Sequence, residues 1–394
     1  MKLLIEYARI ITETHIIDNG WLFADNGRIE DYGAMPTPPI VADTHINGGG
    51  NLLMPGFIDL HVHGAVGHDT MDANPEGLAE MARFYAAHGV TGFLATTWTD
   101  SHERIYTAMK TVAQMPQKVE VGAEILGVYM EGPFLNAEYC GAQAPEYMRR
   151  ATPEEMAQLF DLGVIRVVAL APEFPENHWL IKVCRERGIQ VSIAHSGASY
   201  AEVIAAVDMG LEHATHTFNA MTGLHHREPG AVGAILTTPS IKAEIIADNI
   251  HVHPTVMKLL WQMKGEDGVI AITDAIRATG LPDGTHMLDS RQITVKDGAC
   301  RLENGTLAGS ILTMDVALRN LAAATGESIE RLWQAMSFNA AKAIGKDRHK
   351  GSIAKGKDAD LVLLTPQSEV ICTIVSGKVA YQRTAQDVLG TRNS

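Results

Sequence analysis

The feature of the sequence that most restricts its fold is a regular alternation of short apolar segments with helical segments, which begins after Pro55. Eight apolar segments of strand length follow one another over roughly 290 residues, and most of them precede a stretch with helical periodicity. They read FIDLHVHG, TGFLATTWT, AEILGVYMEG, VIRVVALAP, IQVSIAHSG, HATHTFNA, KAEIIAD and GVIAITDA. Strands that are apolar on both faces are typical of a buried parallel sheet. The alternation therefore predicts an α/β fold with a closed (β/α)8 barrel, which usually takes about 250 residues.

A doubly wound open sheet is the alternative architecture for such an alternation. Nucleotide-binding sheets of that kind carry a glycine-rich turn after the first strand, with the pattern GxGxxG or GxxxxGK. Neither pattern follows the first apolar segment. The barrel is therefore the preferred interpretation.

The chain changes character at both ends of this alternating region. Residues 1–53 contain short alternating segments separated by turns, and residues 351–394 return to the same pattern. The sequences NGRI, near the start, and SGKVA, near the end, are typical of two hairpins of similar design. We expect the two end segments to pair into one small discontinuous β-sandwich domain, beside a catalytic barrel formed by residues 54–350.

Charge and cysteine content exclude several classes of partner. The chain has 32 basic and 46 acidic residues and a formal net charge of −14, which disfavours nonspecific binding to nucleic acid or to an anionic membrane. It has no apolar run of about 18 residues, and its first residues do not read as a secretory signal. Its four cysteines are dispersed without a CxxC pair, which indicates a reducing compartment. We expect a cytoplasmic protein with neither nucleic acid nor a membrane as a partner.

The first apolar segment ends in a histidine pair, His61 and His63, separated by one residue. Side chains at positions i and i+2 of a strand share a face, with Cα atoms about 6.6 Å apart. Two imidazoles placed in this way can converge on one metal ion. Taken alone, the pair fits two structural histidines equally well.

Titratable residues also end four other predicted strands. Glu131 ends the third strand, His195 the fifth, His216 the sixth and Asp274 the eighth. The carboxyl ends of the strands are the edge at which barrel enzymes build their sites, and unrelated core histidines would not gather there. The five strand ends together therefore predict a metal centre at the mouth of the barrel.

Histidine and carboxylate ligands without thiolate suit Zn, Fe, Mn or Co, and Zn is the first expectation. An ion of this kind lowers the pKa of a bound water to about 7. A carboxylate must then take the proton of the water and return it to the leaving group, and Asp274 is the candidate for this acid and base role. A further metal ligand or a helix cap is the alternative role for Asp274.

The loops after the sixth and seventh strands carry basic and polar residues. TFNAMTGLHHREPG contains Asn219 and Arg227, and IIADNIHVHP contains His251. In an acidic protein, an arginine near a metal site suggests capture of a phosphate or carboxylate, whose shape the guanidinium matches. A solvated surface arginine is the alternative. The glycine-rich turn GTLAGS, residues 305–310, offers further N–H groups to an anion.

Together these motifs resemble those of the N-acetylglucosamine-6-phosphate deacetylases of the amidohydrolase superfamily. They are PGFIDLHVHG, EGPFLNAEYCGAQAP, IAHSGAS, ATHTFNAMTGLHHREPG, IIADNIHVHP, ITDA and GTLAGS. The resemblance covers the whole chain in the order of the family, and EGPFLN and LHHREPG are much more specific than HxH. The N-acetylgalactosamine-6-phosphate deacetylases are closely similar.

The resemblance implies a role for each motif residue. It implies a metal held by Glu131, His195 and His216, with Asp274 as the acid and base residue. The residues that would meet the sugar phosphate are Asn219, the backbone of Ala220, Arg227 and His251. The residues that would lie near the acetamide or the sugar ring are Ala142, Gln143, Leu307, Ala308, Gly309 and Ser310.

Three features vary within the family that the chain resembles. Some members lack both first-strand histidines and use one metal, whereas His61 and His63 imply a second ion here, with Glu131 as the bridge. Some members have a histidine in place of Gln143, whose neutral amide can donate a hydrogen bond but cannot carry a proton. Loop residues such as Arg227 and His251 serve the site of the neighbouring subunit in some members, which implies a homodimer.

We therefore expect hydrolysis of N-acetylglucosamine 6-phosphate to glucosamine 6-phosphate and acetate, in amino-sugar catabolism. The same reaction on the galactosamine compound is the first alternative. A cyclic amidase of the hydantoinase or dihydroorotase type would need a lysine at the end of the fourth strand, where VIRVVALAPE has none. A non-catalytic sugar-phosphate-binding homologue would need an incomplete catalytic set, whereas every position is filled.

Overall fold

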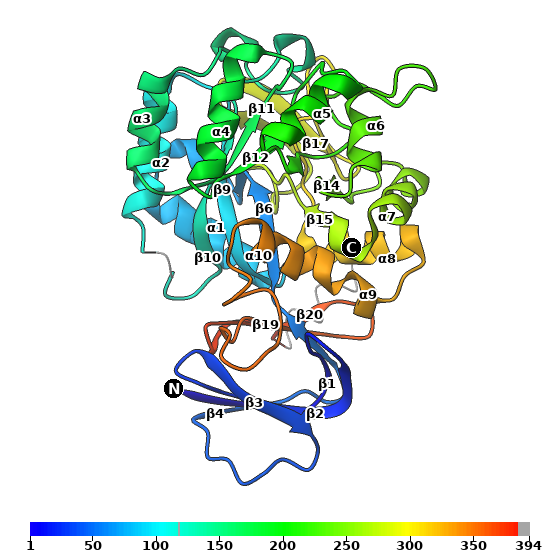
Figure 1. Cartoon of the computed structure of the whole chain (residues 1–394). Helices are drawn as coiled ribbons and strands as arrows, with labels where there is room; N and C mark the ends of the chain where they lie inside the picture. The colour runs from blue at the N-terminus through cyan, green and yellow to red at the C-terminus, as the bar shows by residue number, and fades with distance from the viewer. Residues whose placement is uncertain (117–118, 385–394) are drawn as a thin grey trace.

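Eight parallel strands form the centre of the larger domain in the computed structural model, which describes residues 1–116 and 119–384. Neighbours in the sheet are neighbours in the sequence (Figure 1). The strands are β6 (Phe57–Val62), β9 (Val90–Thr97), β10 (Glu124–Glu131), β11 (Ile165–Leu170), β12 (Gln190–Ile193), β13 (His213–Ala214), β14 (Lys242–Ile246) and β15 (Val269–Ile272). The prediction of a (β/α)8 barrel is confirmed.

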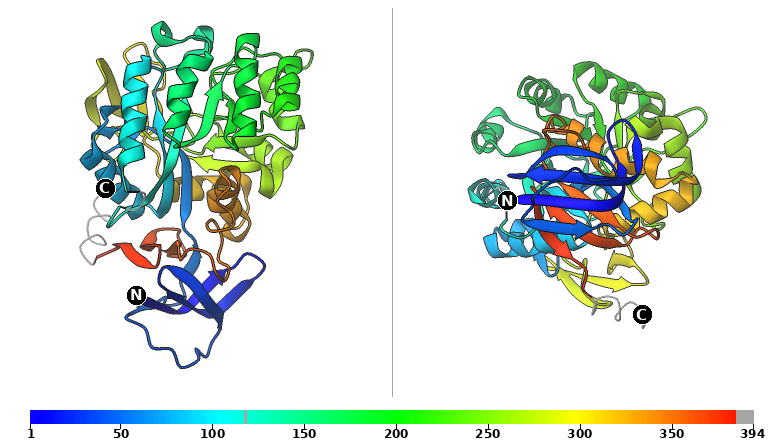
Figure 2. Two further views of the ribbon diagram at one scale, coloured as in Figure 1. Left: turned by 60° about the vertical axis from the view of Figure 1, so that its left-hand side comes forward. Right: turned by 90° about the horizontal axis from the view of Figure 1, so that it is seen from below.

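One helix follows each barrel strand and packs on the outside of the barrel (Figure 2). The eight helices are α1 (Pro75–Ala87), α2 (His102–Gln114), α3 (Pro153–Asp161), α4 (His178–Glu186), α5 (Tyr200–Met209), α6 (Gly230–Thr237), α7 (Pro254–Gly268) and α8 (Met314–Thr325). Capping residues set where helices begin. Before α5, the Ser199 hydroxyl accepts the N–H of Glu202, whose carboxylate accepts the N–H of Ser199, which is a capping box.

The first and last strands close the barrel through individual hydrogen bonds. Beyond the end of β15, the N–H of Asp274 donates to the carbonyl oxygen of His61 at 2.9 Å. One layer deeper, the buried carboxylate of Asp59 accepts the Thr273 hydroxyl at 2.6 Å and the Thr273 N–H at 3.2 Å. Because these bonds join β6 to the chain after β15, they hold His61 beside Asp274 at the mouth.

The two ends of the chain join in one second sheet, as the hairpin patterns predict. Its strands are β1 (Lys2–Ile11), β2 (Ile16–Asp25), β3 (Arg28–Ala34), β4 (Thr44–Asn47), β5 (Leu52–Pro55), β19 (Leu361–Leu364), β20 (Val370–Val375) and β21 (Lys378–Gln382). β19 pairs with β5 in antiparallel register, and residues of both end segments share one hydrophobic core. The prediction of a small β domain built from both ends of the chain is therefore confirmed, and its strands belong to one continuous sheet. Its predicted residues 385–394 lie outside the described part of the chain, and the domain boundaries stay a prediction.

The small domain lies at the end of the barrel where the strands begin. β5 leads directly into β6, so the chain enters the barrel from the side of the small domain (Figure 1). Because the eight strands are parallel, their carboxyl ends lie at the opposite end. The candidate site therefore faces away from the small domain.

Lys350 links the two domains electrostatically. Its buried Nζ lies 2.7 Å from Glu124 at the start of β10, and 2.6 Å and 3.2 Å from Asp360 and Asp358, which precede β19. Burial would lower the pKa of Lys350, but the carboxylates of Asp360 and Glu124 raise it well above its usual value. The lysine therefore keeps its charge and balances acids of both domains.

We expect Lys350→Met to lower the free energy of unfolding by about 3 to 5 kcal/mol, because it leaves buried carboxylates without their cation. Urea unfolding followed by circular dichroism measures the change. Lys355→Met is the matched control, since the Lys355 ammonium pairs with Asp31 at the surface and its loss should have no measurable effect. Equal stability of the two variants would contradict the proposed electrostatic link.

Further elements were not predicted. β16 (Gly284–Leu288), β17 (Arg291–Lys296) and β18 (Ala299–Leu302) form a three-stranded antiparallel sheet between β15 and α8. The short strands β7 (Gly64–Ala65) and β8 (His68–Asp69) pair after β6, and α9 (Ile329–Trp333) and α10 (Asn339–Ala343) follow α8. Over residues 1–116 and 119–384, no helix is both long and apolar enough to span a membrane.

Candidate metal centre and active site

The titratable residues at the strand ends converge at the mouth of the barrel. Glu131 Oε1 lies 3.1 Å from the Nε2 atoms of both His195 and His216. Its other oxygen, Oε2, lies 3.1 Å from His63 Nε2 and 3.5 Å from His61 Nε2. All five side chains are buried. Glu131 therefore lies between two pairs of histidines and presents one oxygen to each.

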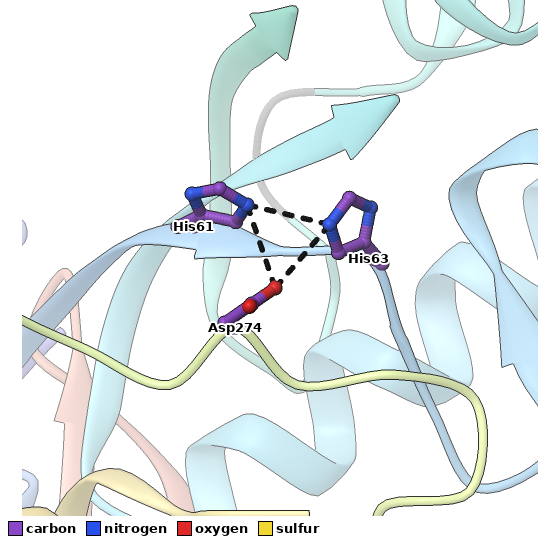
Figure 3. A group of neighbouring side chains, drawn as sticks. All are labelled: His61, His63 and Asp274. Atoms are coloured by element: carbon purple, nitrogen blue, oxygen red, sulfur yellow. Dashed lines mark hydrogen bonds and ion pairs between the residues drawn. The ribbon is translucent and has the colours of Figure 1, made fainter. Parts of the chain in front are cut away.

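The donor atoms fall into two groups. In the first group, His61, His63 and Asp274 offer ligand atoms that all lie within 4.8 Å of one another, and Figure 3 shows the two imidazoles and the carboxylate facing a common centre. The second group consists of Glu131, His195 and His216, under the same limit. Each group has the histidine and carboxylate composition that suits Zn and neighbouring transition metals.

The facing imidazole nitrogens indicate that these groups fit a cation. His195 Nε2 and His216 Nε2 are 3.2 Å apart, and His61 Nε2 and His63 Nε2 are 3.3 Å apart. A neutral imidazole has one N–H and one lone pair, and two facing lone pairs repel unless a cation lies near both. His195 Nδ1 donates to the carbonyl oxygen of Tyr139 at 2.8 Å, so Nε2 of a neutral His195 carries the lone pair.

The backbone turns sharply where three of these side chains enter the site. His195, His216 and Asp274 have φ values of 43°, 29° and 52°, in the left-handed region that few residues other than glycine adopt. Such strain is found mostly at functional sites, where the surrounding fold maintains it. These turns end β12, β13 and β15 and direct the side chains toward the barrel axis.

Both acids of the site stay ionised. Burial alone would raise the pKa of Glu131, but attraction to the neighbouring imidazoles of His61, His195 and His216 holds it well below its usual range. For Asp274, burial again raises the pKa, and the neighbouring His61 and His63 outweigh it and lower the pKa. Two carboxylates therefore face the imidazoles at neutral pH, as a metal ligand and a general base require.

A cavity of about 180 Å³ opens above these groups. Twelve of the residues predicted from the sequence line it: His63, Glu131, Ala142, Gln143, His195, His216, Asn219, Ala220, His251, Asp274, Leu307 and Gly309. His251 Nδ1 lies 2.6 Å from Asp248 Oδ2, which fixes the ring at the cavity wall. The cavity therefore combines the metal groups with the predicted substrate-binding positions.

Four predicted residues do not line this cavity. His61 lies beneath it, fully buried. Arg227 is exposed on its loop, where its guanidinium contacts His226 Nε2 at 2.6 Å. Ala308 and Ser310 are buried, and their N–H groups donate to the carbonyl oxygens of Cys300 and Asp274. The suggestion that the N–H groups of the GTLAGS turn meet an anion is therefore wrong for these two residues, since both N–H groups are used within the fold.

Sequence reasoning missed several residues at the cavity. Trp98 lines it, stacks on the His63 ring with centroids 3.8 Å apart, and donates from Nε1 to Asp69 at 3.2 Å. Its place at the end of the second predicted strand is the signal that could have found it. The other lining residues that were missed are Gly141 and Ile246, whereas Thr306 belongs to the GTLAGS turn that the sequence had singled out.

Comparison with known proteins identifies the family. The sequence profile of the amidohydrolase family matches residues 52–380, which is most of the chain. The chain belongs to the amidohydrolase family. Its two candidate metal groups thus lie in an amidohydrolase barrel.

Within the amidohydrolases, the chain resembles amino-sugar-phosphate deacetylases. It is 38% identical over 386 residues to the N-acetylglucosamine-6-phosphate deacetylase of Bacillus subtilis strain 168, covering 96% of this chain and 97% of that protein. It is 36% identical over 382 residues to the N-acetylgalactosamine-6-phosphate deacetylase of Escherichia coli O157:H7, covering 96% and 100%. A Mycobacterium smegmatis N-acetyl-D-glucosamine-6-phosphate deacetylase mutant, solved with N-acetyl-D-glucosamine-6-phosphate, has a TM-score of 0.89 at 30% identity, covering 97% of this chain and 99% of that chain. The resemblance predicted from the motifs is confirmed.

Proposed function

We propose that this amidohydrolase hydrolyses the N-acetyl group of N-acetylglucosamine 6-phosphate to give glucosamine 6-phosphate and acetate. The observation that carries the proposal is the carboxylate of Glu131, shared between two histidine pairs beside the ionised Asp274 on the floor of a small cavity. The names of the relatives support this substrate. Release of acetate and free amine from the purified protein tests the reaction.

Glu131, His195 and His216 would hold one divalent ion, and His61 and His63 with Asp274 a second. When bound, such an ion supplies positive charge that makes water acidic enough to ionise near neutral pH. We propose Zn, with Fe, Mn or Co as alternatives that the same ligand set accepts. Metal analysis of the purified protein, and recovery of activity when each ion is added after chelation, decide between them.

Asp274 would move the proton in the reaction. Its carboxylate takes a proton from the attacking water as the water oxygen adds to the acetyl carbon. It then gives that proton to the amide nitrogen as the C–N bond breaks, so that acetate and a free amine leave. The lowered pKa of Asp274 keeps it in the ionised form that the first step needs.

Gln143 would orient the acetyl group. Its Oε1 accepts the N–H of Thr99 at 2.8 Å, which assigns Nε2 to the side that faces Glu131. One N–H of that amide donates to Glu131 Oε2. The second N–H is available to the acetyl oxygen, where a hydrogen bond that strengthens as negative charge develops lowers the barrier.

We propose that the phosphate is bound by Asn219, the Ala220 N–H, His251 and Arg227. Asn219 and His251 line the cavity, whereas Arg227 of the same chain does not. The position of Arg227 outside the cavity of its own chain supports a homodimer in which Arg227 reaches the cavity of the other subunit.

A reducing cytoplasm is the proposed location, because the four cysteines are dispersed and unpaired.

Arg227→Ala is expected to raise KM for N-acetylglucosamine 6-phosphate by about 10- to 100-fold, because a charge-assisted hydrogen bond to the phosphate is lost. KM for unphosphorylated N-acetylglucosamine should not change. Steady-state kinetics with both compounds measure the two KM values. Arg83→Ala, at an exposed position of α1, is the control and should leave both values unchanged.

Mixed dimers test which subunit uses Arg227. If it serves the neighbouring site, Arg227→Ala subunits refolded with Asp274→Asn subunits should recover about a quarter of wild-type activity at low substrate, since half of the dimers then hold one complete site. Each variant alone should stay nearly inactive under these conditions. Mixtures as inactive as the separate variants would place Arg227 in its own subunit's site.

The galactosamine compound is the second candidate substrate, because a relative of similar identity carries that name. Values of kcat/KM for the two 6-phosphates, measured on one metal-replete sample, discriminate between them. Tight binding of either compound without any release of acetate would instead favour the non-catalytic alternative.

A further inference from the structure

One layer of the barrel interior, at the base of the candidate metal groups, is polar. His61, Tyr129, Ser192 and Glu244 come from β6, β10, β12 and β14, which are alternate strands of the barrel, and all four are fully buried. Layers of four side chains from alternate strands are the usual packing of such barrels, but bulky apolar residues normally fill them. Ile246, two residues after Glu244, lines the cavity, so Glu244 points the same way one layer deeper.

Hydrogen bonds connect this polar layer and lead to Glu244. Ser192 Oγ and Thr215 Oγ1 are 2.7 Å apart, and Thr215 Oγ1 lies 2.7 Å from the Tyr129 hydroxyl. That hydroxyl donates to Glu244 Oε2 at 3.3 Å. Burial and the charge of Glu244 raise the pKa of Tyr129 well above its usual value, so its hydroxyl keeps its proton.

The Glu244 carboxylate faces a metal ligand from below. Its Oε2 lies 3.6 Å from His61 Nδ1, and both side chains are inaccessible to solvent. Within the described part of the chain, neither His61 Nδ1 nor Glu244 Oε1 has a hydrogen-bond partner. The opposite nitrogen of His61, Nε2, faces His63 and Asp274 (Figure 3). Glu244 thus places a carboxylate oxygen beside His61 Nδ1, the nitrogen that does not face His63 and Asp274.

We propose that Glu244 is a positioning residue that accepts the Nδ1 proton of His61 and thereby keeps Nε2 directed at the ion held with His63 and Asp274. The inference rests on the proposed role of His61 as a ligand. In the other group, the carbonyl oxygen of Tyr139 accepts the Nδ1 proton of His195 in the same way. Carboxylates behind metal-binding histidines typically change metal affinity by about 10- to 100-fold. Glu244 therefore controls the occupancy of the His61 group and leaves the other group unaffected.

Metal titration of Glu244→Gln tests the proposal. The substitution keeps the shape of the side chain and replaces the anionic acceptor by an amide. Titration of the metal-free variant with Zn²⁺, followed by calorimetry and elemental analysis, should show one ion bound as in the wild type and a second bound about 10- to 100-fold more weakly. Excess Zn²⁺ should restore two ions per subunit.

Ser192→Ala is the matched control, because Ser192 belongs to the same buried layer and its hydroxyl contacts Thr215 rather than Glu244. It should bind both ions as the wild type does. Unchanged affinity for both ions in Glu244→Gln would overturn the proposal, and so would equal weakening of both, which indicates a general loss of structure. Acetate release plays no part in this test, so an inactive wild type that still shows the selective effect would refute the proposed function alone.

A measurement on the unmodified protein covers the case in which Glu244→Gln does not fold. Nitrogen-15 NMR of histidine-labelled, Zn²⁺-loaded protein should show a proton on His61 Nδ1 that exchanges slowly with water. Loss of that signal in His61→Asn assigns it. A His61 ring with its proton on Nε2, or one that does not respond to Zn²⁺, would overturn the proposal.

Discussion

Asp274→Asn is expected to lower kcat by about 10³-fold or more. An amide at this position has nearly the same shape but cannot take a proton from water. It also cannot return one to the leaving nitrogen, so both proton transfers are lost. Acetate release under saturating substrate measures the loss.

Metal content separates a lost proton transfer from a lost ion in this variant. The ion held by Glu131, His195 and His216 should remain, because Asp274 belongs to the other group. Asp297→Asn, in the surface turn between β17 and β18, is the control and should keep full activity. Near-normal turnover of Asp274→Asn would refute the proposed acid and base role.

Glu131→Gln is expected to abolish measurable turnover and to weaken metal binding in both groups. Each oxygen of this carboxylate faces a different pair of histidines, so one substitution removes negative charge from both. His63→Ala, by contrast, should weaken only the ion of the His61 group. Elemental analysis of the two variants after dialysis against the same limiting Zn²⁺ measures the difference.

Two results would contradict this view of Glu131. Retention of both ions in Glu131→Gln would show that the carboxylate does not bridge the two groups. Loss of both ions in His63→Ala would show that the groups are not separable. Either result would leave the predicted effect of Asp274→Asn unaffected.

The barrel was predictable because its signal is local and repeated. The strands are mostly apolar, and most of them precede a stretch with helical periodicity, so eight units can be counted without knowing how they pack. The sheet of β16, β17 and β18 was not predicted. Its short strands are polar on one face, so the segment has no strong apolar run to mark it.

The site was predictable in part for a similar reason. His61, Glu131, His195, His216 and Asp274 were predicted as a group because the carboxyl ends of parallel strands meet at one edge. Trp98 and Glu244 were missed, although both lie on barrel strands or at their ends. Glu244 lies within an apolar segment of the sequence. That it faces His61 depends on how far each barrel strand is shifted along the next one.

The sequence alone determined which residue types stand at the ends of the strands, since apolar periodicity and turn residues act over a few positions. Only the tertiary structure decided that Glu131 offers one oxygen to each histidine pair, that Glu244 lies behind His61, and that Arg227 lies outside the cavity of its own chain. These relations join residues separated by tens to hundreds of positions. They depend on the stagger of eight strands and on the paths of their loops, which the packing of the whole barrel sets.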